Sequence, residues 1–257
     1  MILAVLSAGL LAQNKAGDNP AAEIRPVEDF RIVPVRVHPL RCTDPAAAGT
    51  KLTETDVTRI FRKANGIWHA AGIHLWVESI VEESPASVEG HENDRTLPMD
   101  ALLPLRPDRS MGNGMFHVYY VGAMVVNGVF MRRDGVFVQE AARLVVVPGG
   151  IDEPLPRVTS HELGHGMGLP HRQARTNLMA SGTTGTSLND DEIHTARLKA
   201  ESFKWTDTAE AFLKTAETLT SDKKAQAESR FRAIADLPGV SPLKDRAKAR
   251  LEGRSNQ

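Results

Sequence analysis

The sequence has one cysteine, Cys42, few aromatic residues and almost no net charge. A single cysteine excludes an intrachain disulfide, so a disulfide framework cannot indicate the compartment. The 31 Lys and Arg residues are balanced by 32 Asp and Glu residues, which leaves a formal net charge of −1. No run of Lys and Arg follows an aromatic-rich strand, and the sequence therefore predicts no nucleic-acid partner.

Long hydrophobic runs are also scarce. The first residues, "MILAVLSAGLLAQ", form a short apolar run that ends near small residues. This is typical of the hydrophobic region of a signal peptide, although a basic start is missing, and a simple hydrophobic tail is the alternative. The run is too short to span a bilayer, so no stable membrane insertion is expected. We expect a soluble, exported protein, either secreted or periplasmic.

The rest of the composition is that of a globular protein. The chain has 257 residues, of which 41% are hydrophobic and 25% charged. This length can bury one substantial core together with a small second unit.

The first half of the chain predicts a strand, a helix and a second strand. "FRIVPVRVHPL" and "IHLWVESIVEE" alternate apolar and polar residues, as strands do. Between them, residues 52–72 carry apolar residues at helical spacing, with Thr53 and Asp56 as a capping start and Gly72 as a stop. The length suits a right-handed parallel crossover.

Further elements follow a long loop over residues 84–114. "MFHVYYVGAM" predicts a third strand, and "NGVFM" and "DGVFVQE" predict two short strands joined tightly. Asp152 and Pro154 are start signals for the next helix. A later helix, in "SLNDDEIHTARLKAESF", is capped by Asn189 with Glu192 reaching back.

Residues 205–257 differ in composition, being rich in Ala, Lys and Glu. They predict three helical stretches, the last starting at Pro242 after Ser241. Their charged faces are either solvated or a surface for a protein partner.

The segment "SHELGHGMGLPH" places three histidines and one glutamate within twelve residues. His161 and His165 are four residues apart and so share one face of a helix. Gly168 can take the positive φ that ends a helix and turns the chain back, which would bring His171 to the same ion. Three histidines leave a fourth position for water, as in catalytic zinc sites, although cobalt or manganese also suits these ligands.

Glu162 lies about 100° around the helix from His161 and need not bind the metal. It can take a proton from the metal-bound water as general base and deliver it to a leaving amine. The alternative is that these are ordinary helix residues with no role in metal binding, because H-E-x-x-H alone also occurs by chance. The full pattern H-E-x-x-H-x-x-G-x-x-H is far more demanding and favours a metal site.

This pattern resembles the zinc-binding helix of the metzincin clan of metallopeptidases, and most of all its matrixins and their bacterial relatives. The clan has a methionine-containing turn beneath the metal, and "TNLMASG" supplies Met179. Some members place a tyrosine ligand two residues later, but Ser181 occupies that position here, so a four-coordinate site is expected. The similarity covers roughly residues 30–203, and only residues 161–179 carry specific motifs.

The resemblance implies a zinc-dependent endopeptidase with one catalytic Zn²⁺ held by His161, His165 and His171, and Glu162 as general base. A protein or peptide substrate would lie extended along an edge strand, "NGVFM", with the "ARTNLMASGTTG" segment forming the wall of the pocket beyond the cleaved bond. The implied fold is α/β, a mixed, twisted five-stranded sheet with the zinc helix behind the cleft.

The expected organisation has three parts. Residues 1–29 are a signal-like segment and linker, residues 30–204 the catalytic domain, and residues 205–257 a helical extension. One alternative function is a non-catalytic protein that is stabilised by zinc and binds a partner through these helices. Another is zinc-dependent hydrolysis of a non-peptide amide.

Other candidates are weaker. Cys42 superficially resembles the cysteine that masks zinc in matrixin pro-forms, but it falls inside the expected catalytic fold and is interpreted as an ordinary thiol. Arg132 or Arg133 could bind a substrate carboxylate, although a turn between strands is charged in any case. The remaining histidines fit no ligand spacing and are expected to make local hydrogen bonds: His38, His69, His74, His91, His117 and His194.

Overall fold

The computed structural model describes residues 25–132 and 135–253. Most of the expected signal-like segment, residues 1–24, lies outside these ranges, so export and the secreted or periplasmic location stay predictions. Within the described ranges, no helix combines the length and the apolar character needed to cross a membrane.

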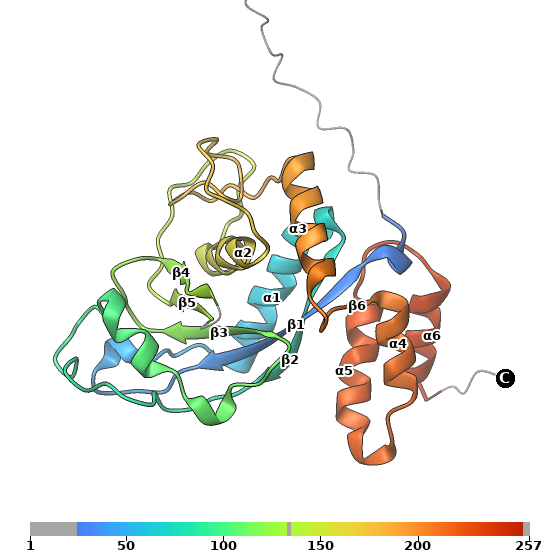
Figure 1. Cartoon of the computed structure of the whole chain (residues 1–257), viewed down its shortest axis with the longest axis horizontal. Coiled ribbons are helices and arrows are strands. Elements are labelled where there is room, and N and C mark those ends of the chain that lie inside the picture. Colours follow the sequence, from blue (N-terminus) through green and yellow to red (C-terminus); the bar gives the residue numbers. More distant parts are fainter. Residues whose placement is uncertain (1–24, 133–134, 254–257) are drawn as a thin grey trace, which may run out of the picture.

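A mixed sheet forms the centre of the molecule (Figure 1). Its main strands lie in the spatial order β2-β1-β3-β5-β4. Their bounds are β1 (Arg31–Pro39), β2 (Ile73–Ile80), β3 (Phe116–Val121), β4 (Gly128–Phe130) and β5 (Val136–Gln139). Four of these strands run parallel and β4 runs antiparallel to β5. The predicted α/β class and the mixed sheet of five strands are confirmed, and β2 and β4 are its two edges.

The predicted strand–helix–strand unit is also confirmed. β1 and β2 are parallel neighbours, and helix α1 (Glu54–Trp68) connects them. The start of α1 has a full capping box, in which the Thr53 hydroxyl accepts from the Asp56 N–H and the Asp56 carboxylate accepts from the Thr53 N–H. A short 3₁₀ turn, η3 (His69–Ala71), then leads to Gly72, whose φ of 63° lets the chain reverse into β2.

Residue alternation along β3 divides the core between the two faces of the sheet. Val118 and Tyr120 face α1, α2 (Pro154–Gly166) and α3 (Asp190–Ser202), which cover one side. Tyr119 and Val121 face the other side. The long loop predicted over residues 84–114 covers that second face with three 3₁₀ turns, so β3 is buried on both sides: η4 (Met99–Ala101), η5 (Leu103–Leu105) and η6 (Asp108–Ser110). One further turn, η2 (Ala46–Ala48), precedes α1.

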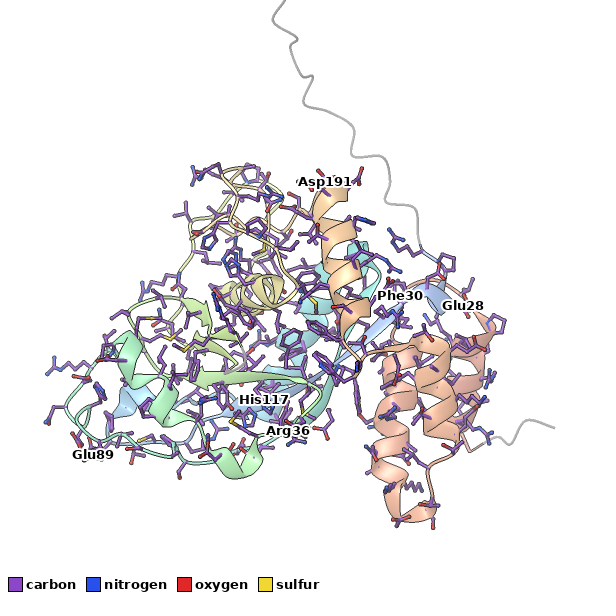
Figure 2. All side chains as sticks on the ribbon, viewed as in Figure 1. Glu28, Phe30, Arg36, Glu89, His117 and Asp191 are labelled. Atoms are coloured by element: carbon purple, nitrogen blue, oxygen red, sulfur yellow. The ribbon has the colours of Figure 1, made fainter. Side chains whose placement is uncertain are left out.

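Three helices follow the sheet, as predicted for the C-terminal segment: α4 (Ala209–Glu217), α5 (Lys224–Ala235) and α6 (Pro242–Leu251), with the turn η8 (Ser221–Lys223). Ser241 caps α6 and Pro242 is its first residue. The helices have an apolar cluster of their own, to which Trp76 of β2 and Phe30 also belong. Figure 2 shows Phe30 beside these helices. The division into units at residues 29 and 204 stays a prediction.

Three local expectations are corrected. The segment beginning at residue 205 starts with a short strand, β6 (Asp207–Thr208), which pairs antiparallel with Arg31 and Ile32. A strand of two residues is too short to show the alternation of apolar and polar side chains by which a strand is recognised in a sequence. The end of the expected linker is the turn η1 (Val27–Asp29), and Val27 is buried against the C-terminal helices. Finally, Asp152 does not cap α2.

The cap position of α2 is Glu153, whose side chain accepts no capping bond. Asp152 instead accepts a hydrogen bond from Lys63 of α1 at 2.7 Å. The start of α2 is therefore fixed by Pro154 and by contacts to α1, not by a capping side chain.

Candidate metal centre

Helix α2 carries the first two histidines on one face, and a glycine turn returns the third. The helix ends where the N–H groups of Gly168 and Leu169 bond to the carbonyls of His165 and Gly164, at 3.0 and 2.9 Å. Gly168 has φ of 84°, the left-handed conformation that the sequence predicted for this position. The chain then doubles back, and His171 comes to lie beside His165.

The three imidazoles converge on one point. One nitrogen from each of His161, His165 and His171 can be chosen so that all lie within 4.8 Å of one another. His165 Nε2 and His171 Nε2 are 3.1 Å apart. Two nitrogens bound to one tetrahedral zinc, at bonds of about 2.0–2.1 Å, would be about 3.3 Å apart. The spacing therefore suits two ligands of a single ion.

Hydrogen bonds fix the orientation of two of the rings. His161 Nδ1 donates to the Leu178 carbonyl and His165 Nδ1 to the Leu169 carbonyl, each at 2.8 Å. Because a carbonyl can only accept, each Nδ1 carries the proton and each Nε2 keeps its lone pair for the centre of the cluster. Burial lowers the pKa of His161 to about 3 and also lowers that of His165. Three imidazole nitrogens form a donor set that fits Zn²⁺.

Glu162 lies next to the cluster and lines the same cavity. Burial raises the pKa of its carboxyl to about 7, while the charge of Arg157 and a backbone hydrogen bond at Phe130 act in the opposite direction. The strand β4 approaches it closely, since a Cβ at Gly128 would lie 2.8 Å from Glu162 Cγ. Glycine at this position lets the edge strand and the glutamate line one site.

Met179 lies beneath the helix, in the turn that follows the third histidine. Its side chain is fully buried, and a Cβ at Gly164 would lie only 2.6 Å from its sulfur. The Met179 N–H donates to the Asn177 side chain at 2.7 Å, and the Met179 carbonyl accepts from the Arg172 N–H at 2.9 Å. The turn is therefore held against α2 from below.

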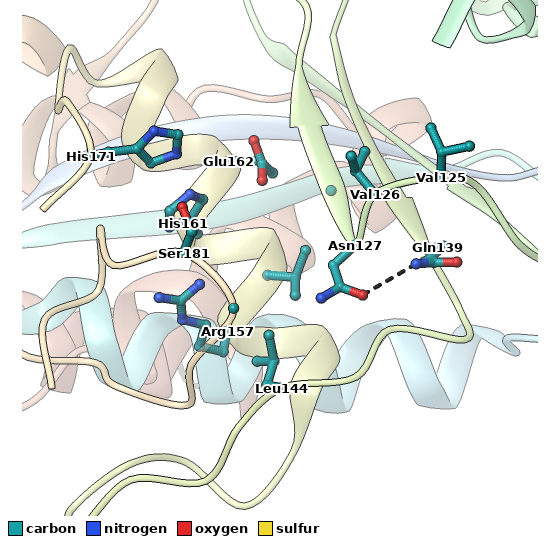
Figure 3. A pocket seen from close by; sticks show the side chains of 13 residues that line it. Val125, Val126, Asn127, Gln139, Leu144, Arg157, His161, Glu162, His171 and Ser181 are labelled. Atoms are coloured by element: carbon teal, nitrogen blue, oxygen red, sulfur yellow. Dashed lines mark hydrogen bonds between the residues drawn. The ribbon is translucent and has the colours of Figure 1, made fainter. Parts of the chain in front are cut away.

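The cavity beside the histidines has a volume of about 400 Å³ (Figure 3). It is lined by the segment before β4, by the connection between β5 and α2, by α2 and by the loop after Met179, including Val125, Val126, Leu144, Arg157, Val158 and Ser181. Arg157 was not singled out from the sequence. It stands four residues before His161, a helical spacing that places both on one face, and this was the signal available.

The other histidines lie away from this cluster. His38 and His117 form a buried pair at 2.9 Å on the face of the sheet opposite α2, where Figure 2 labels His117, and His38 also bonds to Glu83 at 2.7 Å. His69 and His74 form another pair at 3.1 Å. In the described part of the chain, His161, His165 and His171 are the one group of three or more metal-ligating residues brought together.

The remaining candidates have local roles or lie outside the described residues. The Cys42 thiol donates to the Asp44 carbonyl at 3.3 Å, as an ordinary thiol would. Arg132 takes a left-handed conformation with φ of 49° in the connection between β4 and β5, and Arg133 is outside the described ranges. Arg172 bonds to Glu192 at 2.7 Å.

Comparisons with known proteins give distant matches. No model of a protein family matches the chain, and no curated protein matches its sequence. Among solved structures, the archaemetzincin of Methanopyrus kandleri is 13% identical with a TM-score of 0.46, over 66% of this chain and 96% of that one. A protein from the structure of a chaperone–substrate complex is 12% identical with a TM-score of 0.46, over 68% of this chain and 35% of that one. Similarity at this level does not assign the chain to a family.

Proposed function

We propose that this chain is a zinc-dependent endopeptidase of the metzincin type, with zinc held by His161, His165 and His171. The convergence of the three imidazoles, two of them oriented by backbone carbonyls, is the observation that carries the proposal. When bound, zinc polarises the peptide carbonyl and makes water a stronger nucleophile.

Glu162 is proposed as the general base. Its carboxylate takes a proton from the attacking water and transfers it to the nitrogen of the leaving amine. Its place in the cavity, beside the histidines but outside the group of ligands, supports this role.

The free edge of β4 is proposed to bind the substrate. β4 stands at the end of the strand order, and Gly128 lies directly against Glu162 and Val158 of α2. An extended peptide that pairs with this edge would pass over the cavity, and its backbone hydrogen bonds would hold the scissile bond near Glu162.

The alternative of a non-catalytic, zinc-stabilised binding protein is less well supported. A purely structural zinc site has no use for a general base, and it is closed by a fourth protein ligand. Here the cluster opens on a cavity that contains Glu162.

The proposal is tested with the purified protein by measuring its zinc content and its cleavage of a mixed peptide library. One zinc per chain and cleavage that stops with a chelator and returns with zinc are expected. His165→Ala should lose both zinc and cleavage, while His194→Ala, an exposed residue of α3, should lose neither. One zinc per chain without cleavage of any peptide would favour the binding protein.

A further inference from the structure

Arg157 is a buried cation on the same helix face as the first histidine. Its side chain is only 2% exposed, and its hydrogen bonds all go to backbone carbonyls. Nε donates to Gly185 at 3.2 Å, and Nη2 donates to Leu178 at 2.7 Å and to Ala180. Nη1, which carries two further N–H donors, makes no hydrogen bond among the residues that the structure describes.

No carboxylate of the described residues forms an ion pair with Arg157. Glu162 is the carboxylate whose charge acts on it, and burial lowers the pKa of the guanidinium to about 10, so it stays charged at neutral pH. A buried charge without an ion-pair partner in direct contact is costly, and an anion that binds Arg157 directly would offset part of that cost.

The cavity leads from the histidines to this cation. Figure 3 shows Arg157 beyond His161, with its guanidinium beside the loop that carries Ser181. Val126, Leu144 and Val158 form an aliphatic part of the lining, beside polar residues such as Asn127 and Ser181. An occupant that matches this lining has an aliphatic stem and a negatively charged end.

We propose that this cavity recognises the side chain of a glutamate next to the scissile bond, with the Arg157 guanidinium binding its carboxylate. This inference rests on the proposed function, because it assigns a substrate class to the same site. Arg157 and His161 are separated by one helical turn, about 6 Å along the axis, so a side chain that reaches Arg157 belongs to a residue close to the metal cluster. Nη1, whose two N–H groups make no hydrogen bond among the described residues, can donate a charge-assisted hydrogen bond to a carboxylate, and such a bond is stronger than one to the neutral oxygen of an amide.

The experiment compares pairs of peptides in which one side chain ends in either a carboxylate or a carboxamide. Each pair carries Glu or Gln at one of the two positions that flank the cleaved bond, and both ends are blocked so that no other carboxylate is present. At one flanking position, kcat/KM for the Glu peptide should exceed that for the Gln peptide at least about tenfold, the ratio expected for a charge-assisted hydrogen bond. Equal values at both positions would overturn the proposal and leave the peptidase intact.

Variants of Arg157 test whether this residue causes the preference for Glu over Gln. Arg157→Met should bring the Glu to Gln ratio close to one, while Arg157→Lys, which keeps the charge, should retain a preference for Glu. Arg232→Met, on α5 and away from the cavity, is the matched control and should leave the ratio unchanged. Because Arg157 also ties α2 to the loop after Met179, zinc content and circular dichroism are measured for each variant. If Arg157→Met does not fold, the ratio of the unaltered protein decides the question.

A binding measurement separates this inference from the proposed function. Zinc-loaded Glu162→Gln, which should not turn peptides over, is titrated with fluorescent Glu and Gln peptides, and anisotropy gives both Kd values. Tighter binding of the Glu peptide, by about tenfold or more, would support the pocket even if no hydrolysis were ever found. Equal Kd values would contradict it even in an active peptidase.

Discussion

Gly164 allows Met179 to lie directly against the helix that bears the histidines. A Cβ at this position would lie 2.6 Å from the methionine sulfur and 3.2 Å from its methyl group, and the Met179 side chain is fully buried. We predict that Gly164→Ala lowers the free energy of unfolding by about 1–3 kcal/mol, because overpacking outweighs the gain in helix propensity. It should also weaken zinc binding, since the turn below the histidines must shift.

A second helical glycine provides the control. Gly66 lies inside α1, and a Cβ there would meet nothing within 4 Å. Gly66→Ala should therefore stabilise the protein by about 0.5–1 kcal/mol. Urea unfolding and zinc titration of both variants check this pair, and equal effects would show that Met179 does not constrain Gly164.

At the residue scale, site residues could be predicted from the sequence where their spacing along a helix determines which side chains lie on the same face. The four-residue step from His161 to His165 and the glycine at 168 predicted the convergence with His171. Arg157 and Gly128 were missed because their importance depends on a cavity and on a strand brought against α2 by distant parts of the chain. The four-residue spacing of Arg157 and His161 indicates a shared helix face, but no local pattern shows the cavity or the approach of the strand.

The N-terminus of α3 is the element that holds the loop after the third histidine. Glu192 completes the predicted capping box with Asn189, and it also accepts hydrogen bonds from Arg172 and Asn177, each at 2.7 Å. Burial acts to raise the pKa of Glu192, but the hydrogen bonds from the Asn189 backbone, Arg172 and Asn177 together outweigh it and lower the pKa. One carboxylate thus joins a helix start to the turn that contains Met179.

We predict that Glu192→Gln lowers the free energy of unfolding at pH 7 by about 1–3 kcal/mol. A carboxyl whose folded-state pKa is lowered stabilises the protein above its unfolded pKa and loses this contribution as the pH falls through the folded value. The difference between the variant and the unaltered protein should therefore shrink below about pH 4.5.

Urea unfolding between pH 7 and pH 3 measures this difference. Asp191→Asn is the matched control, because Asp191 stands on the same helical turn but is exposed to solvent (Figure 2). Its effect should stay within about 0.5 kcal/mol. A difference for Glu192→Gln that did not change with pH would contradict the role given to its charge.

At the element scale, helices with a capping residue and a glycine or proline boundary were predicted well, because these signals are local. The strand β6 was missed because its two residues are too few to show the two-residue periodicity of apolar side chains in a strand. The 3₁₀ turns over residues 84–114 were missed as well, because their order comes from packing on the sheet and not from a repeat in the sequence.

Across the whole molecule, Trp76 links the sheet to the C-terminal helices. Its ring lies 4.9 Å from that of Phe212 and 4.8 Å from the Arg230 guanidinium, and its Nε1 donates to Ser229 at 3.0 Å. Trp76 itself belongs to β2, an edge of the sheet.

We predict that Trp76→Ala destabilises α4–α6 by about 3–5 kcal/mol and leaves the metal centre folded. Limited proteolysis should then cut residues 205–257 first, while zinc content stays at one per chain. Trp68→Ala, which empties the core beneath α1, should instead destabilise the sheet and the metal centre together. If Trp76→Ala lost its zinc at the same urea concentration at which α4–α6 unfold, the prediction that the two parts unfold separately would be wrong.

The direct test of a zinc peptidase with Glu162 as general base is the rate of peptide cleavage by Glu162→Gln and by the unaltered protein at equal zinc content. The glutamine side chain has nearly the same size as that of Glu162 but has no carboxylate that could accept a proton. A fall in kcat of about 10²–10⁴ with zinc retained is predicted. Undiminished cleavage by the zinc-loaded variant would contradict the proposed role of Glu162 and the mechanism built on it.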